Sequence, residues 1–574
     1  KIIPSDEFEP SFPTFERFPR PRDVLVVDMK KFLRYDRRPS VTAEAWILGS
    51  GTASLAAAVY LIRHAMLPPS SVHILDEHIS LEHLLHREGS SSTGYDQFAG
   101  CLPIPVGRSL QELLDMIPSA GLEERSFLDD IHEETEKRLA LNSQHGTCFV
   151  SGRDGSFKHL PTKRLNLGIK DRFSLIRLLL KHESHLHKRQ IQEFFRAKFF
   201  ESTFWEIWSI QFGFQPWHSA TEFRRSVRQY LSKFSNFSIL TCLDITGYYQ
   251  YDSILLPIYF YLQGLGVDFQ FNTKVANVET SASKDRIQTI VGLSVRQDEL
   301  DLKINLGPDD IVIATLGSTV SGSAIGTNNL PPAWRSVQPS DHLDENWSLW
   351  LEAGNKYPDM GDPYTFCTRK SESMMESFTI TTEHMEFFDY LNSLSRCKSE
   401  AGAIFLIKDS SWGLCLCTPA QPVFTHQPPN VRVLWGFGRF PEEKGDCVNN
   451  SMVYCCGAQI MAEIVHHLEL PSEMAAEVLL QSITIPRAMP RMSSTLLTRS
   501  SDDRPRIIPK SVSNLGLVGS FVEIPGRTCV DTGYGVDAAR IAVSHLMGLE
   551  PWTLEYSEYS HPSFSRLLGT LILR

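Results

Sequence analysis

A glycine turn joins a short apolar strand to a helix of small residues near the start of this chain. Residues 45–48, Ala-Trp-Ile-Leu, are typical of a buried strand, and the run Gly49-Ser-Gly-Thr-Ala-Ser leads into the helix. Gly49 permits the tight turn, Gly51 lets backbone approach a pyrophosphate, and Ser54 stands where a third small residue allows close packing of helix on strand. We therefore expect a dinucleotide-binding turn that contains these three residues.

The residues that follow complete a βαβ pattern. A helix is expected from Ser54 to Ala65, and a second strand from Val72 to Leu75 that ends at two acids. An acid at the end of the second strand accepts hydrogen bonds from ribose hydroxyls in such sites. Asp76 and Glu77 are both candidates, and the pattern does not choose between them.

A similar arrangement closes the chain. The stretch from Asn514 to Pro525 is typical of a strand and a loop, and a helix of small residues follows it. Such an ending brings the N-terminus of a helix to a flavin. Phe521, Val522 and Gly533 are the candidate cofactor-binding residues of this segment.

Periodicity divides the chain into five parts. We expect an N-terminal arm over residues 1–36 and a discontinuous nucleotide-binding domain over 37–110, 236–320 and 500–548. Helical periodicity over 111–235 predicts a helical cap, 321–499 predicts a substrate domain of strands and loops, and 549–574 is a C-terminal tail. The expected fold class is α/β, with a Rossmann-like domain, a helical cap and a mixed α+β substrate domain.

The composition limits the classes of binding partner and the cellular compartment that we expect for this protein. The chain of 574 residues has 56 Lys and Arg against 67 Asp and Glu, a net charge of -11, and no dense basic stripe that would neutralise nucleic acid. Eleven cysteines without a CxxC pair resemble neither a disulfide framework nor a zinc site, so we expect a cytoplasmic protein. His182, His185 and His187 lie in a charged run typical of a solvated helix face, so no metal site is expected.

The two ends leave further possibilities open. The N-terminal residues lack the basic start and apolar run of a signal peptide, but the chain begins at Lys1, so a removed targeting segment stays open. The residues from Phe564 to Arg574 are apolar enough to touch a membrane surface, although a helix docked on its own protein is the more common arrangement. A homodimer also stays open.

Six segments, taken in chain order between about Glu44 and Leu549, match the motifs of one known family. They are Gly49-Ser-Gly-Thr-Ala-Ser-Leu-Ala-Ala-Ala, Phe204-Trp-Glu-Ile-Trp, Trp217-His-Ser-Ala-Thr-Glu-Phe-Arg-Arg, Tyr248-Tyr-Gln-Tyr-Asp-Ser, Asp503-Arg-Pro-Arg and Phe521-Val-Glu-Ile-Pro. Together they resemble the FAD-binding oleate hydratases, also called the myosin-cross-reactive antigen family. The resemblance implies FAD, a helical cap and a substrate domain around a long apolar tunnel. It also implies addition of water across an isolated cis double bond, with flavin required but no net redox change.

This sequence departs from the family at the positions that carry its chemistry. The resemblance places Ala99 and Gly100 in a loop facing the flavin and puts the family's water-activating Glu on Leu102. The Tyr that follows the family's Arg-Arg pair is Ser226 here, and an aliphatic hydroxyl is a poor proton donor to carbon. The polar residues that hold a fatty-acid carboxylate in the family become Cys417, Pro419 and Val423. Because a buried carboxylate needs polar partners, we expect a substrate that is less acidic or is anchored elsewhere.

Other residues are candidates for the missing roles. Tyr95, Asp96 and Gln97 precede Leu102 in the loop that faces the flavin and could supply an acid or a base, although a Gly-Tyr-Asp turn is as often structural. Tyr249 is a further catalytic candidate, together with Ser226, although buried tyrosines more often satisfy backbone groups. The substrate pocket is expected to contain Leu102, Cys417, Pro419, Val423 and Tyr248.

These patterns favour an enzyme of secondary metabolism that uses FAD mainly as a scaffold. It would carry an apolar polyene, such as a terpenoid, through a non-redox cyclisation, Diels-Alder-type cycloaddition or isomerisation. A cycloaddition needs no acid or base, because the protein can act by holding the substrate in a near-attack conformer. Three alternatives stay open: an FAD-dependent hydratase, which is a lyase, of a fatty-acid or other lipid double bond; a lipid-binding flavoprotein without catalysis; and a redox flavoenzyme.

Overall fold

The structure is a computed structural model that describes residues 43–78, 89–96, 107–119, 122–141, 148–151, 157–159, 167–231, 254–282, 287–298, 300–333, 343–395, 403–419, 421–424, 426–550 and 569. The predicted N-terminal arm and most of the predicted C-terminal tail lie outside these residues. Six candidate site residues also lie outside them and stay predictions: Gln97, Ala99, Gly100, Leu102, Tyr248 and Tyr249.

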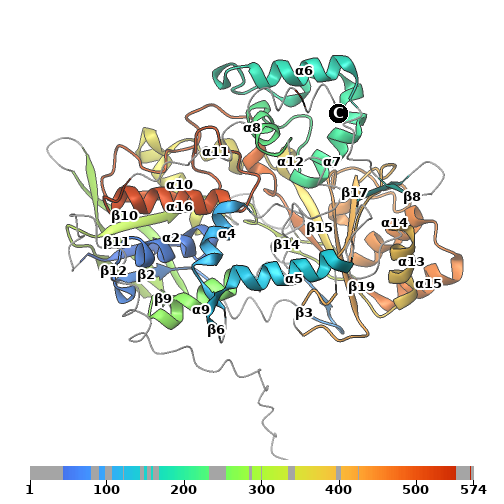
Figure 1. Ribbon diagram of the computed structural model, residues 1–574, viewed down its shortest axis with the longest axis horizontal. Coiled ribbons are helices and arrows are strands. Elements are labelled where there is room, and N and C mark those ends of the chain that lie inside the picture. Colours follow the sequence, from blue (N-terminus) through green and yellow to red (C-terminus); the bar gives the residue numbers. More distant parts are fainter. Residues whose placement is uncertain are drawn as a thin grey trace, which may run out of the picture.

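A five-stranded parallel sheet forms the core of the first domain, on the left in Figure 1. In sheet order its strands are β20 (Leu515–Val518), β13 (Ile311–Thr315), β1 (Ala45–Leu48), β2 (Val72–Leu75) and β9 (Asp268–Gln270). All four neighbouring pairs are parallel. Helix α2 (Thr52–Arg63) packs against α16 (Gly533–Leu546) and contacts α9 (Leu256–Leu265). The predicted α/β class with a Rossmann-like sheet is confirmed, and we call this part the parallel-sheet domain.

The βαβ opening follows the sequence closely. Strands β1 and β2 have the predicted bounds, whereas α2 begins at Thr52 and ends at Arg63, before the predicted limits of Ser54 and Ala65. The core positions of α2 are mostly alanine, leucine and valine, and its residues from Ala53 to Ile62 are buried. Small side chains let this helix lie close to the sheet and to α16.

An eight-stranded sheet forms the second domain, on the right in Figure 1. In sheet order its strands are β14 (Ala324–Ile325), β19 (Ser482–Met489), β15 (Met375–Thr382), β18 (Arg432–Gly438), β17 (Leu414–Thr418), β16 (Ala403–Leu406), β7 (Cys148–Ser151) and β8 (Phe157–His159). Beside this sheet lie the helices α13 (Met385–Ser395), α14 (Gly457–Leu468) and α15 (Ser472–Gln481). The prediction of a helical segment over 111–235 was wrong for β7 and β8, because β7 pairs in parallel with the distant strand β16.

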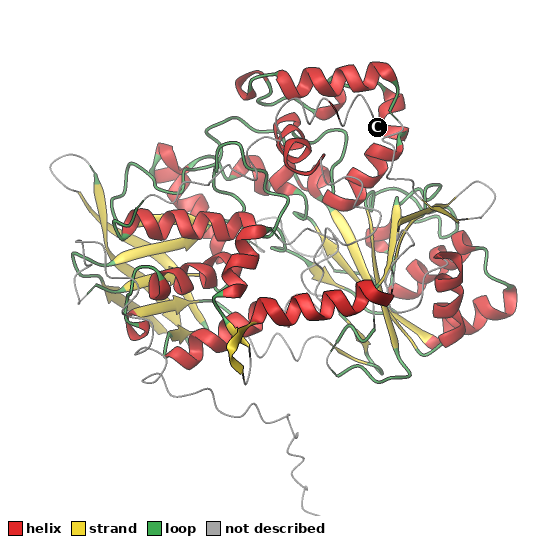
Figure 2. Ribbon diagram, viewed as in Figure 1, coloured by secondary structure: helices red, strands yellow, loops and turns green. Residues whose placement is uncertain are grey.

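The remaining elements connect and flank the two sheets. They are η1 (Pro69–Ser71), hairpins β3 (Gly89–Ser90) with β4 (Gly94–Tyr95) and β5 (Pro118–Ser119) with β6 (Leu122–Ser126), helices α4 (Arg108–Asp115), α5 (Phe127–Leu141), α10 (Glu345–Lys356), α11 (Tyr364–Cys367) and α12 (Lys370–Ser373), antiparallel strands β10 (Thr273–Ala282), β11 (Gln288–Gln297) and β12 (Leu300–Asn305), and short helices η8 (Pro358–Met360), η9 (Met452–Tyr454) and η10 (Ser494–Leu496). Strands gather in two groups, and α5 runs between them (Figure 2). Within the described residues, no helix has both the length and the apolar character needed to cross a bilayer.

A helical cap lies above the second domain and the centre of the molecule, at the top of Figure 1. We define the cap as residues 167–231; it contains α6 (Ile169–Leu180), η2 (Glu183–His185), η3 (Ile191–Glu193), η4 (Ala197–Glu201), α7 (Thr203–Phe212) and α8 (Ala220–Tyr230). Aromatic side chains fill its interior, where the ring of Phe223 lies edge-on to Phe195 and Trp208. His218 is fully buried, and its ring and the indole of Trp217 both contact the carbonyl of Glu372, which ties the cap to the second domain.

Candidate functional site

The turn between β1 and α2 leaves backbone exposed where a phosphate group could approach. Gly49 has a φ of 99°, in the left-handed region that favours glycine, and its N–H donates to the carbonyl of Leu75 at 2.8 Å. A side chain at the exposed Gly51 would meet no atom within 4 Å. Helix α2 has neither a side-chain cap nor an acid in its first turn. Its first N–H groups and its dipole therefore favour an anion here.

Ser54 fixes the start of α2 against the sheet. Its side chain is fully buried, and its hydroxyl shares a hydrogen bond of 2.7 Å with the hydroxyl of Thr315 on β13. The neighbouring Ala53 lies 3.2 Å from the position that a Cβ on Gly535 of α16 would take. Helix α2 thus contacts strand β13 and helix α16 through small residues.

Of the two acids that end β2, Asp76 lies closer to this turn. Burial acts to raise the pKa of Asp76, but hydrogen bonds from His78 and Ser50 outweigh it and hold the pKa below its usual range. Its carboxylate accepts from the backbone N–H of His78 at 2.8 Å. Glu77 instead accepts from the backbone N–H of Glu345 at 3.2 Å, at the start of α10. The geometry favours Asp76 as the ribose acceptor.

Glu345 is a residue of this site that the sequence interpretation missed. It is buried, and burial together with the charges of Glu77 and Asp76 raises its pKa to about 9, although a hydrogen bond of 2.7 Å from the backbone N–H of Val275 opposes this. Glu345 is therefore neutral at neutral pH. The available sequence signal was Asp344, an N-cap residue that accepts from Trp347 at 3.1 Å and marks the start of α10.

The C-terminal candidates contribute packing rather than exposed polar groups. The ring of Phe521 is buried and lies edge-on to Trp347 at 4.9 Å. Val522 is also buried, and its carbonyl accepts from the hydroxyl of Tyr534 at 2.9 Å. Gly533 begins α16, where an added Cβ would lie 3.2 Å from the Cα of Gly107.

Tyr95 and Asp96 lie in the described part of the chain, and both are engaged. Tyr95 is buried, its ring stacks on Phe424 at 4.7 Å, and its hydroxyl donates to the carbonyl of His426 at 3.4 Å. Asp96 is buried in an ion pair with Arg487 of β19. Both side chains are therefore held by partners elsewhere in the chain.

Ser226 and the three replaced anchor positions are also packed. The hydroxyl of Ser226 donates to the carbonyl of Phe223 at 2.8 Å and accepts from the indole of Trp208 at 3.0 Å, so its single proton is committed. Cys417 and Val423 are both buried, but in different apolar clusters, and Val423 shares its cluster with Tyr95. The carbonyl of Pro419 accepts from the side chain of Gln421 at 3.0 Å. The structure brings Tyr95 and Val423 together and leaves Ser226 within the cap.

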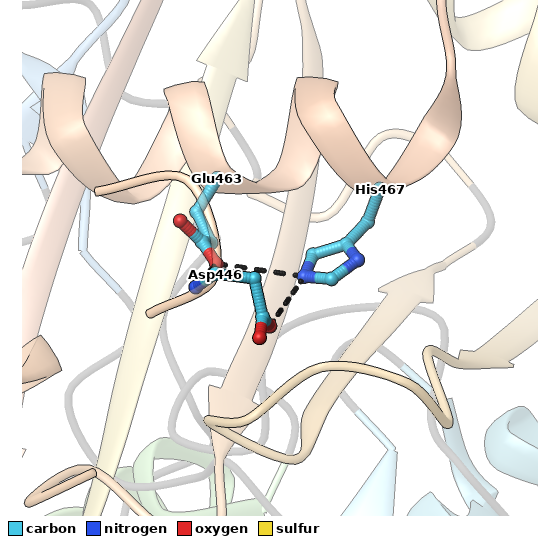
Figure 3. A group of neighbouring side chains, drawn as sticks. All are labelled: Asp446, Glu463 and His467. Carbon is cyan, nitrogen blue, oxygen red and sulfur yellow. Dashed lines mark hydrogen bonds and ion pairs between the residues drawn. The ribbon is translucent and has the colours of Figure 1, made fainter. Parts of the chain in front are cut away.

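A second polar group, away from this site, joins Asp446, Glu463 and His467 (Figure 3). The imidazole of His467 lies 3.2 Å from the carboxylate of Asp446 and 3.5 Å from that of Glu463. Glu463 accepts from the backbone N–H groups of Cys447 and Val448 at 3.0 and 2.8 Å. Because Glu463 holds successive backbone N–H groups of the loop that contains Asp446, we interpret the group as a loop anchor.

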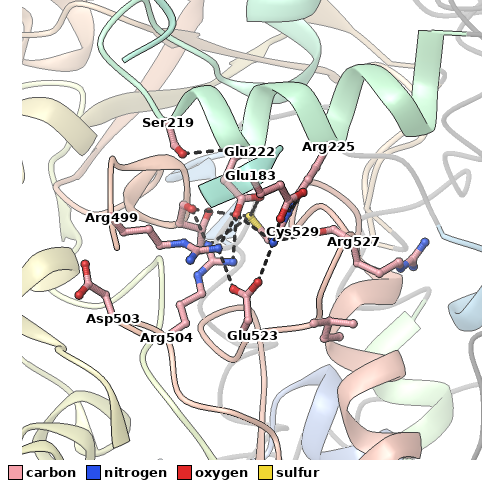
Figure 4. Close-up of polar contacts among 12 residues, drawn as sticks. Glu183, Ser219, Glu222, Arg225, Arg499, Asp503, Arg504, Glu523, Arg527 and Cys529 are labelled. Atoms are coloured by element: carbon pink, nitrogen blue, oxygen red, sulfur yellow. Dashed lines mark hydrogen bonds and ion pairs between the residues drawn. The ribbon is translucent and has the colours of Figure 1, made fainter. Parts of the chain in front are cut away.

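A buried network of charges joins the cap to the parallel-sheet domain (Figure 4). At its centre is Glu222 of α8, which is fully buried and accepts from Arg499 at 2.9 Å and from Arg504 at 3.3 Å. Burial acts to raise the pKa of Glu222, but the charges of Arg504, Arg225 and Arg499 outweigh it and lower the pKa to about 2. The carboxylate therefore stays charged over the whole physiological range.

Arg225 extends the network across the contact between the cap and the parallel-sheet domain, which we call the junction. Its guanidinium donates to Glu183 of the cap at 2.7 Å and to Glu523 of the C-terminal segment at 2.7 Å, and also to the carbonyl of Arg527 at 3.2 Å. Glu523 in turn accepts from Arg499 at 2.8 Å. The motif that begins at Asp503 thus contributes Arg504 to these ion pairs.

We expect the variant Glu222→Gln to destabilise the protein strongly. It would leave Arg499 and Arg504 buried without their shared carboxylate, and removing one partner of a buried pair costs about 3–5 kcal/mol. Urea unfolding followed by tryptophan fluorescence measures the change in the free energy of unfolding. The matched control, Glu352→Gln, removes the acid of an exposed pair with Lys356 and should cost no more than about 0.5 kcal/mol. Equal effects of both variants would contradict the network's role.

Comparisons with known proteins agree with this fold. Residues 42–544 match the MCRA family model. An oleate hydratase of Streptococcus pyogenes serotype M49 (strain NZ131) is 31% identical over 552 residues, which cover 92% of this chain and 87% of the relative. A linoleate hydratase of Lactiplantibacillus plantarum is 26% identical over 556 residues, 89% of this chain and 94% of the relative.

Solved structures are more distant. A crystal structure of an oxidoreductase from Methanosarcina mazei has 12% identity and a TM-score of 0.45, with 86% of this chain and 99% of that chain covered. A flavoprotein/dehydrogenase from Cytophaga hutchinsonii has 11% identity and a TM-score of 0.34, with 92% and 86% covered. Likeness at this level bears on neither substrate nor cofactor. The family model and the curated relatives decide the question: the chain belongs to the MCRA family, that of the oleate hydratases its motifs resemble.

Proposed function

We propose that this protein binds FAD at the β1–α2 turn. The observation that carries the proposal is the N-terminus of α2, where a Cβ on the exposed Gly51 would meet no atom within 4 Å and no side chain caps the helix. This arrangement fits a pyrophosphate, and Asp76, ionised at neutral pH, fits a ribose hydroxyl. When bound, FAD supplies a large planar ring that a substrate can pack against. Members of the resembled family use the flavin without net redox change, and we propose the same here.

For the reaction, we propose a non-redox cyclisation, cycloaddition or isomerisation of an apolar polyene. Support comes from the engagement of the polar candidates in the described residues: the proton of Ser226 is donated to a carbonyl, and Asp96 is paired with Arg487. Val423 stands where the resembled family carries a polar anchor, and it lies in an apolar cluster with Tyr95. Such surroundings suit a reaction driven by substrate conformation rather than by proton transfer.

Hydration of a lipid double bond is the second candidate. It is favoured by the relatives, which are named oleate hydratase and linoleate hydratase. This candidate needs an acid and a water-activating base, roles for which the sequence offers Asp96 or a tyrosine such as Tyr249. A lipid-binding flavoprotein without turnover is the third candidate, and a redox flavoenzyme, whose flavin would be bleached by NAD(P)H, is the fourth.

The variant Gly51→Leu tests the cofactor site. A Cβ at Gly51 meets no atom within 4 Å, so we expect the flavin-free chain to fold and to lose only about 0.5–1 kcal/mol of stability, the cost of leucine at the N-cap of α2. The same side chain would occupy the approach to the N-terminus of α2, so we expect FAD affinity to fall by roughly tenfold or more. Flavin fluorescence quenching measures the affinity. A variant that keeps wild-type affinity would show that the cofactor binds elsewhere.

Isotope labelling tests the reaction. In the first experiment, the FAD-loaded protein is incubated with oleic acid and linoleic acid in oxygen-18 water. In the second, the metabolites of a host with and without the protein are compared by mass spectrometry. We expect no labelled hydroxy acid, and a product isomeric with the metabolite that is consumed, because no water is added. A labelled product would establish hydration instead. A lipid that copurifies without any product would establish a carrier.

A further inference from the structure

Helix α6 of the cap carries an apolar stripe that faces solvent. Ile169, Phe173 and Leu180 are exposed to 75%, 67% and 61%, unusually high values for large apolar side chains. They lie four and seven positions apart, so they share one face of the helix, and the half-buried Ile176 lies between them on the same face. The stripe is continuous along three turns.

The stripe is not needed to hold α6 in the cap. The other side of the helix is buried through Leu175, Leu178 and Leu179, which already anchor it to the interior. α6 is therefore apolar on two faces, of which the fold uses one. In Figure 1 α6 lies at the upper edge of the molecule.

Basic side chains flank the stripe on both sides. On the helix, Lys170 and Arg177 lie along one border of the stripe and Arg172 along the other. Residues 167–201 contain eight Lys and Arg against four Asp and Glu, in a chain whose total is 56 against 67. Of the four acids, Asp171 is buried beside Arg196, and Glu183 belongs to the network around Arg225. The surface around the stripe is thus positive in a protein that is negative overall.

We propose that this face of α6 binds the surface of an anionic lipid bilayer, with Phe173 and its apolar neighbours inserted among the acyl chains. A helix with an exposed apolar stripe bordered by Lys and Arg has the two features of an interfacial anchor: apolar area to bury and charge that attracts acidic headgroups. A symmetric contact with a second copy fits less well, because it would place Lys170, Arg172 and Arg177 opposite a positive surface. The proposal does not depend on the reaction catalysed.

Vesicle binding of the full chain tests the proposal. Sedimentation with phosphatidylcholine vesicles, with and without phosphatidylglycerol, gives the partition coefficient. We expect binding to the anionic vesicles and a loss of about tenfold or more for Phe173→Gln, because the ring no longer inserts. The double variant Lys170→Gln/Arg177→Gln should weaken binding to anionic vesicles by a similar factor and leave binding to neutral vesicles unchanged. All replaced side chains are exposed, so folding is not at risk.

The matched control is Leu480→Gln, which replaces a leucine exposed to 85% on α15. It should change the partition coefficient by less than about twofold, because no basic border accompanies it. Absence of vesicle binding, or equal binding by the wild type and Phe173→Gln, would overturn the proposal; the latter would place the membrane contact elsewhere. Self-association that is lost in Phe173→Gln, without vesicle binding, would also overturn it in favour of a second copy.

Discussion

One buried carboxylate, that of Glu222, holds the cap in place against the parallel-sheet domain. A charge without water is tolerated only if partners surround it, and here three arginines do so. Two of them, Arg499 and Arg504, come from residues far along the chain, and Arg225 reaches Glu523 on the C-terminal segment. Because each charge depends on the others, the junction is satisfied only when cap and domain are docked together.

This junction determines what the neighbouring residues can do. Ser226 follows Arg225 directly, so the helix that the network fixes also fixes the position where the resembled family has a proton donor. The hydroxyl at that position points into the cap and is shared by Phe223 and Trp208. On the other side of the junction, Glu523 follows Phe521 and Val522, which belong to the same core cluster as strand β1 and helix α2. The network therefore connects the position of Ser226 with the C-terminal segment that carries Phe521 and Val522.

The sequence predicted the parts of the structure that local patterns determine. Strands β1 and β2 have the predicted bounds because a run of apolar residues and a glycine turn specify them nearby. Long-range pairing could not be predicted: β7 and β8 lie in a stretch of helical periodicity, pair with each other and join the eight-stranded sheet through the distant strand β16. Glu345 and Glu222 were missed for the same reason, since the buried surroundings and charged partners that shift each pKa come from other parts of the chain. The choice of Asp76 over Glu77 needed the position of α10.

The most direct test is hydrogen exchange of the native protein. The account predicts that the backbone amides of α8 and those of Glu523 and Arg527, whose N–H groups bond to the carbonyls of Pro505 and Ile524, exchange with the same free energy of opening. In Glu222→Gln both sets should lose the same amount of protection, because cap and domain open as one unit. Faster exchange confined to α8, with Glu523 and Arg527 still protected as in the wild type, would show that the cap opens independently and would contradict the account.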